Sequence, residues 1–246
     1  FQYGGRISFR NNVTFFATGI LSGFDFPADA YEDLFVDLGG GERRPFLPDQ
    51  EGFQPLHGLR LFTWFNTWER FRGRIRAEWR QTPVFEQEVG VPVETAEAWI
   101  VDGSFNVFPT RQLQSEIGIR HESLFLHDGG GRYSTATIPR IRTQYQFTRA
   151  LFLRTIVEYN SQDRTPLTEP SSGLPILQCE DACERSEGTV DHDVYGEVLL
   201  SYEPSPGTVF FLGYSRTMVD DGAFAFRRMS RQSDGLFLKG SYRFRF

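Results

Sequence analysis

Hydrophobic and polar residues alternate along most of this chain in stretches of about ten residues. The closing stretch, 234–246, carries Leu236, Leu238 and Tyr242 on one parity and Lys239, Arg243 and Arg245 on the other. Because successive side chains of a β-strand point to opposite faces, this pattern predicts strands with one apolar and one charged face. Stretches of this kind predict eleven strands, at 2–10, 13–22, 58–66, 72–81, 96–108, 111–121, 136–146, 151–160, 193–202, 208–217 and 234–246.

The predicted strands are joined alternately by short turns and by long loops. The longest loops are 23–56 and 161–192, and a short helix is expected inside the first of them, from Pro27 to Leu38. Strict alternation is typical of an antiparallel up-and-down transmembrane β-barrel, with tight turns at one end and long outer loops at the other. We therefore expect residues 1–246 to form one all-β outer-membrane barrel domain.

The number of strands adds an expectation about the whole protein. Bacterial single-chain barrels have an even number of strands, with both ends on the periplasmic side. Eleven strands that end at the periplasm begin at the outer surface, so an odd number of strands is expected before Phe1. The chain is then the C-terminal part of a larger barrel.

Composition leaves two structural alternatives open. The chain has 39% hydrophobic residues and no apolar run of the ~18 residues that a spanning helix requires. A soluble β-sandwich would bury the apolar faces in a core, whereas a barrel would turn them to lipid. The two cysteines, Cys179 and Cys183, lack the further ligands of a zinc site, so a disulfide in an oxidising compartment is expected, with no metal.

Charge is distributed unevenly between the predicted faces. The net charge is −6, yet the faces opposite the apolar ones carry fourteen cations and five acids, a net +9. Two interpretations remain open: a lumen whose field favours anionic solutes, or arginines that pair with acids and brace the wall. The residues expected to line the lumen are Arg72, Arg74, Arg76, Glu78, Arg80, Arg120, Arg140, Arg142, Arg154, Glu158, Lys239, Arg243 and Arg245, with acids also at Asp102, Glu116 and Glu197.

Aromatic residues occur near the predicted strand ends on the apolar parity. Tryptophan and tyrosine at such positions are typical of the interfacial girdles of membrane barrels, while core packing is the alternative. The expected girdle residues are Trp79, Trp99, Tyr145, Tyr159, Tyr202, Tyr214 and Tyr242.

Two stretches resemble a known family: PRIRTQYQFTRALFLRTIVEY at 139–159 and LLSYEPSPGTVFFLGYSR at 199–216, followed by the closing strand. They are similar to the C-terminal barrel of bacterial outer-membrane proteins that pair a family-nine carbohydrate-binding-like N-terminal domain with a barrel of unassigned function. The resemblance implies an upstream domain and no catalytic residues. The terminal Phe246 resembles the signal that the barrel-assembly machinery reads.

Candidate chemistry is sparse. His121, Ser123 and Asp128 could form a hydrolase site on a barrel rim, and Asp191, His192 and Asp193 form a second polar cluster, but nothing in the spacing specifies a nucleophile, a base and an orienting group. We therefore expect no enzyme and no cofactor. Acidic loops would repel nucleic acid.

The predicted function is porin-like passage or uptake of an anionic or glycan-derived solute across the bacterial outer membrane. The alternatives are a membrane anchor or surface-binding scaffold without transport, and a rim hydrolase. Expected partners are outer-membrane lipid, the barrel-assembly machinery, a solute or glycan, and a partner protein in a larger envelope complex.

Overall fold

The computed structural model describes residues 1–27, 31–48, 52–85, 93–126, 131–179 and 182–243. These residues form two antiparallel sheets, and no helix among them is long and apolar enough to span a bilayer. The larger sheet contains β1 (Gln2–Ser8), β2 (Val13–Phe26), β5 (Gly52–Trp68), β6 (Phe71–Pro83), β7 (Thr95–Val107), β8 (Leu113–Leu126), β9 (Arg132–Gln146), β10 (Leu151–Arg164), β13 (Thr189–Ser205), β14 (Thr208–Val219) and β15 (Ser230–Ser241). The smaller sheet contains β3 (Leu34–Gly39), β4 (Glu42–Pro45), β11 (Ile176–Cys179) and β12 (Cys183–Arg185).

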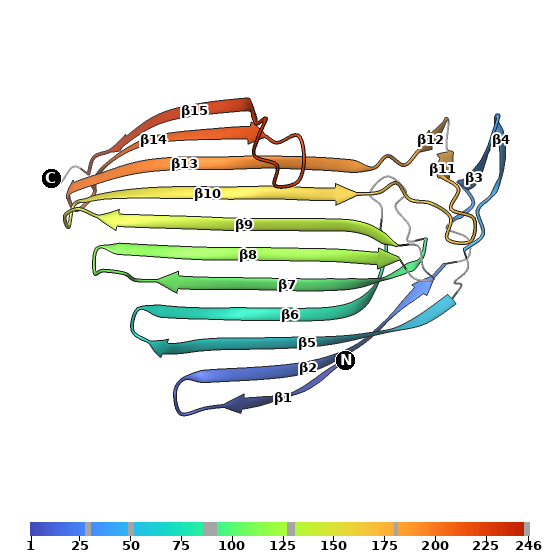
Figure 1. Ribbon diagram of the computed structural model, residues 1–246, viewed down its shortest axis with the longest axis horizontal. Helices are drawn as coiled ribbons and strands as arrows, with labels where there is room; N and C mark the ends of the chain where they lie inside the picture. The colour runs from blue at the N-terminus through green and yellow to red at the C-terminus, as the bar shows by residue number, and fades with distance from the viewer. Residues whose placement is uncertain (28–30, 49–51, 86–92, 127–130, 180–181, 244–246) are drawn as a thin grey trace.

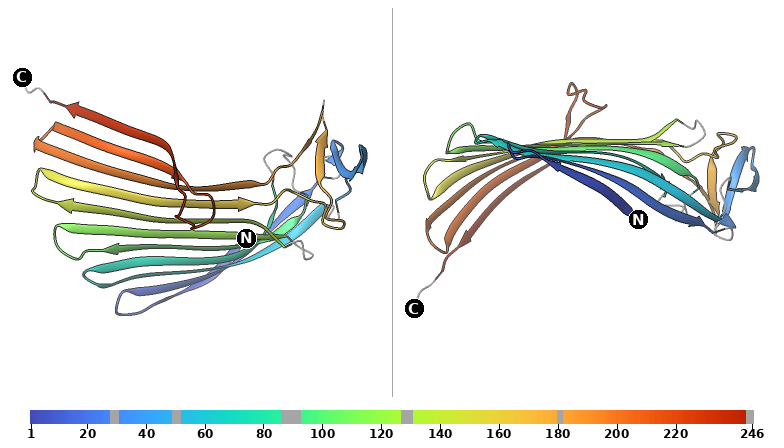
Figure 2. Two further views of the ribbon diagram at one scale, coloured as in Figure 1. Left: turned by 45° about the horizontal axis from the view of Figure 1, so that its top comes forward. Right: turned by 90° about the horizontal axis from the view of Figure 1, so that it is seen from below.

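The eleven strands of the larger sheet follow one another in chain order, each antiparallel to the next (Figure 1). The expected all-β, antiparallel, up-and-down arrangement is therefore confirmed. The sheet is open: β1 and β15 form its two edges and lie at opposite sides of it in Figure 1 and in the left view of Figure 2. Both edge strands run toward the end of the sheet that carries the short turns, so they point in the same direction. We call this the turn end, and the opposite one the loop end.

The register divides the larger sheet into two chemically different faces. One row of paired residues runs Leu61, Ala77, Val101 across β5, β6 and β7. We call the side that carries this row the apolar face. Its large side chains lie open: Leu61, Val101, Ile141, Val157 and Leu212 are 43–52% exposed.

The opposite side, which we call the charged face, carries the neighbouring row Phe62, Arg76, Asp102. Across most of the sheet the apolar face has no other described element packed on it. Burial of a core therefore does not explain its apolar character.

From β5 to β13, each short turn lies farther along the strand direction than the one before it. Phe65 on β5 and Gly196 on β13 belong to one row of paired residues, six strands apart. Phe65 lies four residues before turn residue Glu69, whereas Gly196 lies ten residues before turn residue Pro206. The turn edge thus shifts by about one residue per strand.

The long connections are shorter than the sequence predicts, because the strands extend into them. β2 reaches Phe26, β5 begins at Gly52, β10 reaches Arg164 and β13 begins at Thr189. Between these limits the described parts of both connections, 31–48, 165–179 and 182–188, join in the four-stranded sheet, which we call the cap. The helix predicted from Pro27 to Leu38 is wrong, because β3 occupies its second half and pairs with β11 from the other connection.

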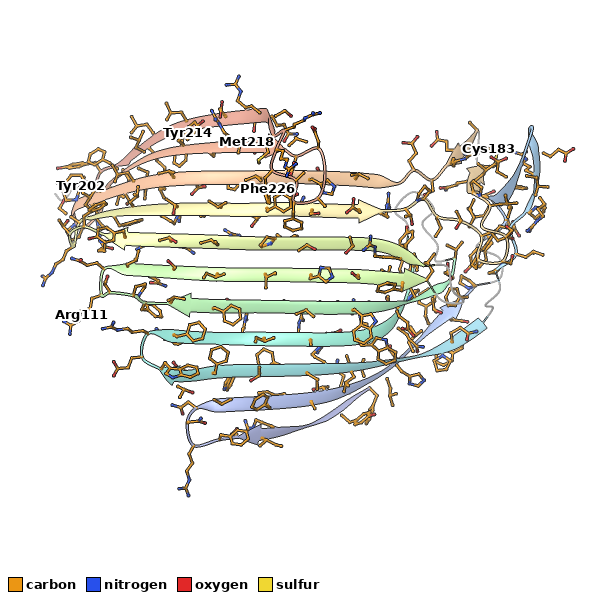
Figure 3. All side chains as sticks on the ribbon, viewed as in Figure 1. Arg111, Cys183, Tyr202, Tyr214, Met218 and Phe226 are labelled. Atoms are coloured by element: carbon orange, nitrogen blue, oxygen red, sulfur yellow. A yellow bond between two sulfur atoms is a disulfide. The ribbon has the colours of Figure 1, made fainter. Side chains whose placement is uncertain are left out.

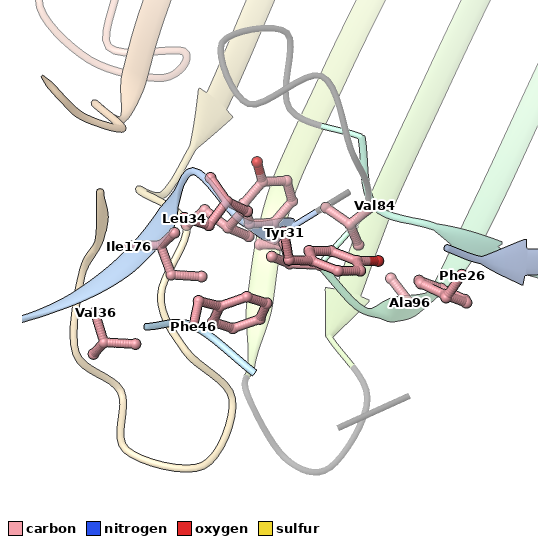
Figure 4. Packing of buried hydrophobic residues seen from close by; sticks show 11 residues of the cluster. Phe26, Tyr31, Leu34, Val36, Phe46, Val84, Ala96 and Ile176 are labelled. Atoms are coloured by element: carbon pink, nitrogen blue, oxygen red, sulfur yellow. The ribbon is translucent and has the colours of Figure 1, made fainter. Parts of the chain in front are cut away.

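Most of the buried hydrophobic residues lie where the cap meets the loop end (Figure 4). Leu34, Val36 and Ile176 come from the cap and are at most 2% exposed. They belong to one cluster with Phe26 and Ala96, which lie at the loop end of the charged face. Figure 4 shows these side chains converging from both parts of the chain. The cap therefore packs against the charged side of the sheet at its loop end.

Candidate functional site

The charged face is braced by ion pairs between and along neighbouring strands. Arg60 and Glu78 face each other across β5 and β6, with Nε and Oε2 2.7 Å apart. Arg76 likewise faces Asp102, and its Nε binds the Oδ2 of that carboxylate. Further pairs join Arg140 to Glu158 (3.3 Å), Arg154 to Glu197 (2.9 Å) and Arg120 to Glu122 (3.0 Å). Directly opposite residues of opposite charge stabilise an antiparallel pair, so the contacts between strands at Arg60–Glu78, Arg76–Asp102 and Arg140–Glu158 help to fix the register.

Glu78 is the most enclosed of these acids. Its residue is 4% exposed, and Arg80 approaches its second carboxylate oxygen at 3.8 Å, so two cations share one carboxylate. An enclosed carboxylate is tolerated when its charge is paired and hydrogen-bonded. Bracing of the wall therefore accounts for a large part of the arginines predicted to line a lumen.

Two cations at the turn end have no such acid. Arg72 and Arg74 form no ion pair within the described residues; the guanidinium of Arg72 lies 4.6 Å from the ring centre of Phe108. Both line a hollow of about 810 Å³ on the charged face, which we call the turn-end hollow. Arg142 also has no ion pair with any residue that the structure describes, although Glu116 of the same hollow is its cross-strand neighbour. Positive charge without an internal partner is therefore concentrated at the turn end.

Aromatic side chains lie beside these arginines on the same face. Phe16, Phe62 and Trp64 form a cluster with ring centres 5.8–6.3 Å apart. Trp64 is the cross-strand neighbour of Arg74, lines the turn-end hollow and is 47% exposed. This cluster was not predicted from the sequence, although Phe62 and Trp64 share the parity of Arg60. A guanidinium next to an open aromatic ring can hold an anionic group together with an apolar or ring-shaped body.

The structure places the residues predicted for the lumen as follows. Arg72, Arg74, Arg76, Glu78, Arg80, Arg120, Arg140, Arg142, Arg154, Glu158 and Lys239 all lie on the charged face. Arg243 follows the end of β15, and Arg245 lies outside the described residues, as does Phe246. Three acids that the sequence assignment left out, Glu122, Asp191 and Asp193, also lie on the charged face, so its net charge is smaller than +9.

All of the expected girdle residues except Tyr242 lie on the apolar face. Trp79 and Trp99 face each other across β6 and β7, and the indole N–H of Trp79 donates to Glu97 at 3.3 Å. Tyr145, Tyr202 and Tyr214 share this face, whereas Tyr242 follows the end of β15. Phe65, Trp68, Phe71 and Phe105 form a further aromatic group at the turn end.

Tyr159 departs from the girdle expectation. It lies on the apolar face of β10, but it is only 5% exposed, because the connection between β14 and β15 folds over it. Its hydroxyl donates to Asp220 and accepts from the backbone N–H of Phe224. Tyr159 therefore holds a loop and does not face outward.

The apolar face also carries ionic residues near its loop end, among them a group on β14 and β15. Arg216 lies opposite Asp234, and their Nε and Oδ1 atoms are 2.7 Å apart. The hydroxyl of Tyr214 donates to the same carboxylate, and Arg231 binds its other oxygen at 3.0 Å. The guanidinium is thus neutralised by a close carboxylate.

The cap has its own polar framework. Glu169 is buried and accepts hydrogen bonds from Ser172 and from Arg44, whose Nη2 lies 2.5 Å away. Burial opposes its charge, yet these hydrogen bonds hold the pKa of Glu169 below its ordinary value. The backbone N–H of Gly39 and then Arg185 lower the pKa of Asp37, while burial raises the pKa of Tyr31 to about 12. Cys179 and Cys183 form a disulfide between β11 and β12.

The polar residues considered for catalysis fall into two groups. Asp128 lies outside the described residues, and Asp191 and Asp193 face away from His192, on the charged face. His121 and Ser123 are in contact on the apolar face, with Nε2 and Oγ 3.1 Å apart. Within the described ranges no group of histidines, cysteines and carboxylates could hold a metal ion.

Comparison of the chain with models of known protein families and with curated proteins finds no match.

Proposed function

We propose that this chain forms the wall of a β-barrel in the bacterial outer membrane and that the barrel passes an anionic solute. In this arrangement the apolar face meets hydrocarbon and the charged face encloses water. The observation that carries the proposal is the open apolar face: Leu61, Val101, Ile141, Val157 and Leu212 are 43–52% exposed on one side of a single sheet. A contiguous apolar surface of that kind on a protein in water would favour aggregation.

The recession of the turns supports a barrel. A shift of six residues along the strands is ~20 Å, and six strand spacings are ~29 Å. If all turns lie at one membrane surface, the strands tilt by about 35° from the barrel axis, and membrane barrels have tilts of about 35–45°. A sheet with level turns would have supported a flat or sandwich arrangement instead.

The distribution of aromatic residues on the apolar face also supports a membrane barrel. Toward the loop end of the apolar face, Trp79 and Trp99 lie where apolar side chains give way to Gln81 and Glu97. At the turn end, Phe65, Phe71 and Phe105 form the opposite border. Two aromatic borders on either side of an apolar band are the arrangement of membrane girdles.

Solute preference follows from the turn-end hollow. Arg72 and Arg74 carry the charge that the wall itself does not neutralise, and Trp64 offers an open ring beside them. A carboxylate or phosphate would bind the guanidinium groups, and a sugar ring or another flat apolar body would stack on the indole. The solute class that fits is a small anionic compound, including an anionic glycan fragment.

A bilayer experiment tests this function. The protein is reconstituted in planar bilayers under a salt gradient, and the reversal potential reports anion selectivity. We expect Arg74→Gln to reduce anion selectivity, and the Arg72→Gln, Arg74→Gln double variant to reduce it further, while Arg228→Gln in the exposed β14–β15 connection leaves it unchanged. A conducting protein whose selectivity is the same in all variants would contradict the solute assignment, and absence of conductance would contradict transport.

The cap favours one alternative, a membrane anchor that conducts nothing. Leu34, Val36 and Ile176 pack the cap on the charged side at the loop end, where it would obstruct a lumen. If this alternative is right, a barrel with a loosened cap conducts while the native protein stays closed. The predicted family, the upstream domain, the partner in an envelope complex and recognition of Phe246 by the assembly machinery stay predictions.

A further inference from the structure

A serine, a histidine and an aspartate meet on the apolar face, just above its apolar band. Ser161 and Asp163 lie on β10, and His192 is the cross-strand neighbour of Ser161 on β13. The Oγ of Ser161 is 3.1 Å from Nδ1 of His192, and Oδ1 of Asp163 is 3.4 Å from its Nε2. Sequence analysis noted His192 beside Asp191 and Asp193, but the register turns both neighbours to the other face.

This constellation has the parts that nucleophilic acyl transfer requires. The imidazole is within reach of the serine hydroxyl and can take its proton, and the carboxylate on the far ring nitrogen orients the ring and stabilises its charged form. Here Nδ1 faces the serine and Nε2 faces the carboxylate, and the tautomer that carries its proton on Nε2 leaves Nδ1 free to act as the base. Ser161 is 3% and His192 5% exposed, so in this conformation the groups are enclosed.

A second serine–histidine pair lies on the neighbouring strands. Ser123 contacts His121 on β8, and the other ring nitrogen of His121 is 2.8 Å from the hydroxyl of Thr137 on β9. Thr137 is the cross-strand neighbour of both His121 and Ser161, so the two pairs form one continuous polar patch. The ring nitrogen of His121 that faces away from its serine meets the hydroxyl of Thr137, whereas the corresponding nitrogen of His192 meets the carboxylate of Asp163. Because a carboxylate stabilises the protonated imidazole better than a hydroxyl does, Ser161 is favoured as the nucleophile.

The connection between β14 and β15, residues 220–229, which we call the flap, lies beside this patch. Phe224 and Phe226 pack on Tyr159, two residues before Ser161, with ring centres 4.5 and 5.1 Å from that of Tyr159. Figure 3 shows Phe226 over β13 and β10. The backbone N–H of Asp220 donates to the carbonyl of His192 at 2.8 Å. The flap is thus tied both to the histidine strand and to the serine strand.

The closed flap is held in an unfavourable conformation. Phe224 and Phe226 have φ angles of 55° and 50°, in the left-handed region that bulky residues avoid. Oδ1 of the buried Asp220 has no hydrogen-bond partner in the described part of the chain. A flap lifted from Tyr159 would be free of both features and would leave the aromatic ring next to Ser161 uncovered.

We propose that Ser161, His192 and Asp163 form an acyl-ester hydrolase site whose access the flap controls. Oγ of Ser161 attacks the ester carbonyl carbon as His192 takes its proton. The carbon–oxygen bond to the alcohol then breaks, and the alcohol leaves with the proton from His192. Water, deprotonated by His192, releases the acid and restores the serine. Ser161 and His192 are the catalytic residues, and Asp163 is a positioning residue.

The substrate class follows from the location of the site. From Ser161 and His192 toward the turn end, the same face continues with Val157 on β10 and Val194 on β13. Asp163 lies on the loop-end side of Ser161. An ester at the border between these zones would have its acyl chain along the apolar strands and its polar head toward Asp163 and the loop end. The class is therefore an amphiphilic, lipid-type acyl ester; this part of the inference rests on the proposed membrane location.

Labelling with a fluorophosphonate probe tests the site without reference to transport. The full chain in detergent micelles is treated with the probe, and the modified peptide is identified by mass spectrometry. We expect labelling at Ser161, its loss in Ser161→Ala and His192→Ala, and no change in Ser201→Ala, which removes an equally buried serine from the charged face of β13. Asp163→Asn should slow labelling by up to ~10⁴-fold, and Asp163→Glu should restore part of the rate.

If the native flap stays closed, the probe cannot reach Ser161, so a variant with a smaller flap is also tested. Phe224→Gly with Phe226→Gly removes the aromatic cover and should label faster than the wild type. No labelling of Ser161 in either protein, or labelling of Ser123 instead, overturns the proposal. p-Nitrophenyl esters of increasing chain length then test the substrate class: hydrolysis that does not increase with chain length contradicts a lipid-type substrate. Conductance should be unchanged in Ser161→Ala, so failure of either function is recognised separately.

Discussion

Arginine residues on the charged face could brace neighbouring strands through ion pairs or attract anionic solutes, and Glu78→Gln separates these two roles. Gln keeps the size of the side chain but removes the charge that Arg60 and Arg80 share at 2.7 and 3.8 Å. With an effective dielectric constant of about 20, the gross attractions at these distances are about 6 and 4 kcal/mol. Most of this is offset by the cost of enclosing the carboxylate, and both arginines are about a third or more exposed, which weakens the pairs further.

We therefore expect Glu78→Gln to reduce the free energy of unfolding by about 2 kcal/mol, below the 3–5 kcal/mol of a fully buried pair. The measurement is a urea titration in detergent micelles, followed by tryptophan fluorescence. In the same variant the wall gains one net positive charge, so anion selectivity in planar bilayers should rise even though stability falls.

Glu116→Gln is the matched control. It makes the same change of charge on the same face, but Glu116 is exposed and forms no ion pair within the described residues. We expect a comparable gain in anion selectivity without loss of stability. If Glu78→Gln is as stable as Glu116→Gln, the ion pairs do not brace the wall, and the reasoning from the distances fails.

Three further predictions concern the apolar face and the cap. Val101→Arg, at a position 43% exposed on the apolar face, should cost ~2–4 kcal/mol in lipid, while Ser104→Arg on the charged face should cost much less; equal losses would contradict the assignment of the faces. Because the folded pKa of Glu169 is lowered, its contribution to cap stability is present above the unfolded value of about 4.5 and is lost as pH falls through the folded pKa. The protection factors of cap amides, which compare the observed exchange rate with the intrinsic rate at the same pH, should therefore be lower at pH 3 than at pH 6 in the wild type, and this pH dependence should be smaller in Glu169→Gln. Leu34→Ala removes a fully buried side chain, should destabilise the cap by ~2–5 kcal/mol and should raise conductance; unchanged conductance would show that the cap does not limit flow.

Features of this fold that depend on residues close together in the chain could be predicted from the sequence, whereas features that depend on distant residues could not. Alternation with a period of two and turn residues such as Asn11 and Asn12 act over a few positions, so the strand sequence, the antiparallel order and the faces of Arg76 and Val101 could be predicted. The Pro27–Leu38 helix failed because Val36 pairs with Ile176, far along the chain, and nothing local indicates that partner.

The sequence by itself determined which residues share a face, because a strand alternates its side chains whatever its neighbours are. Only the tertiary structure decided which charges meet and which groups are covered. Register across strands brings Arg60 to Glu78 and Ser161 to His192, and the folding of one connection places Phe224 over Tyr159. Such contacts are set by packing of the whole sheet, where a shift of one residue would exchange every partner.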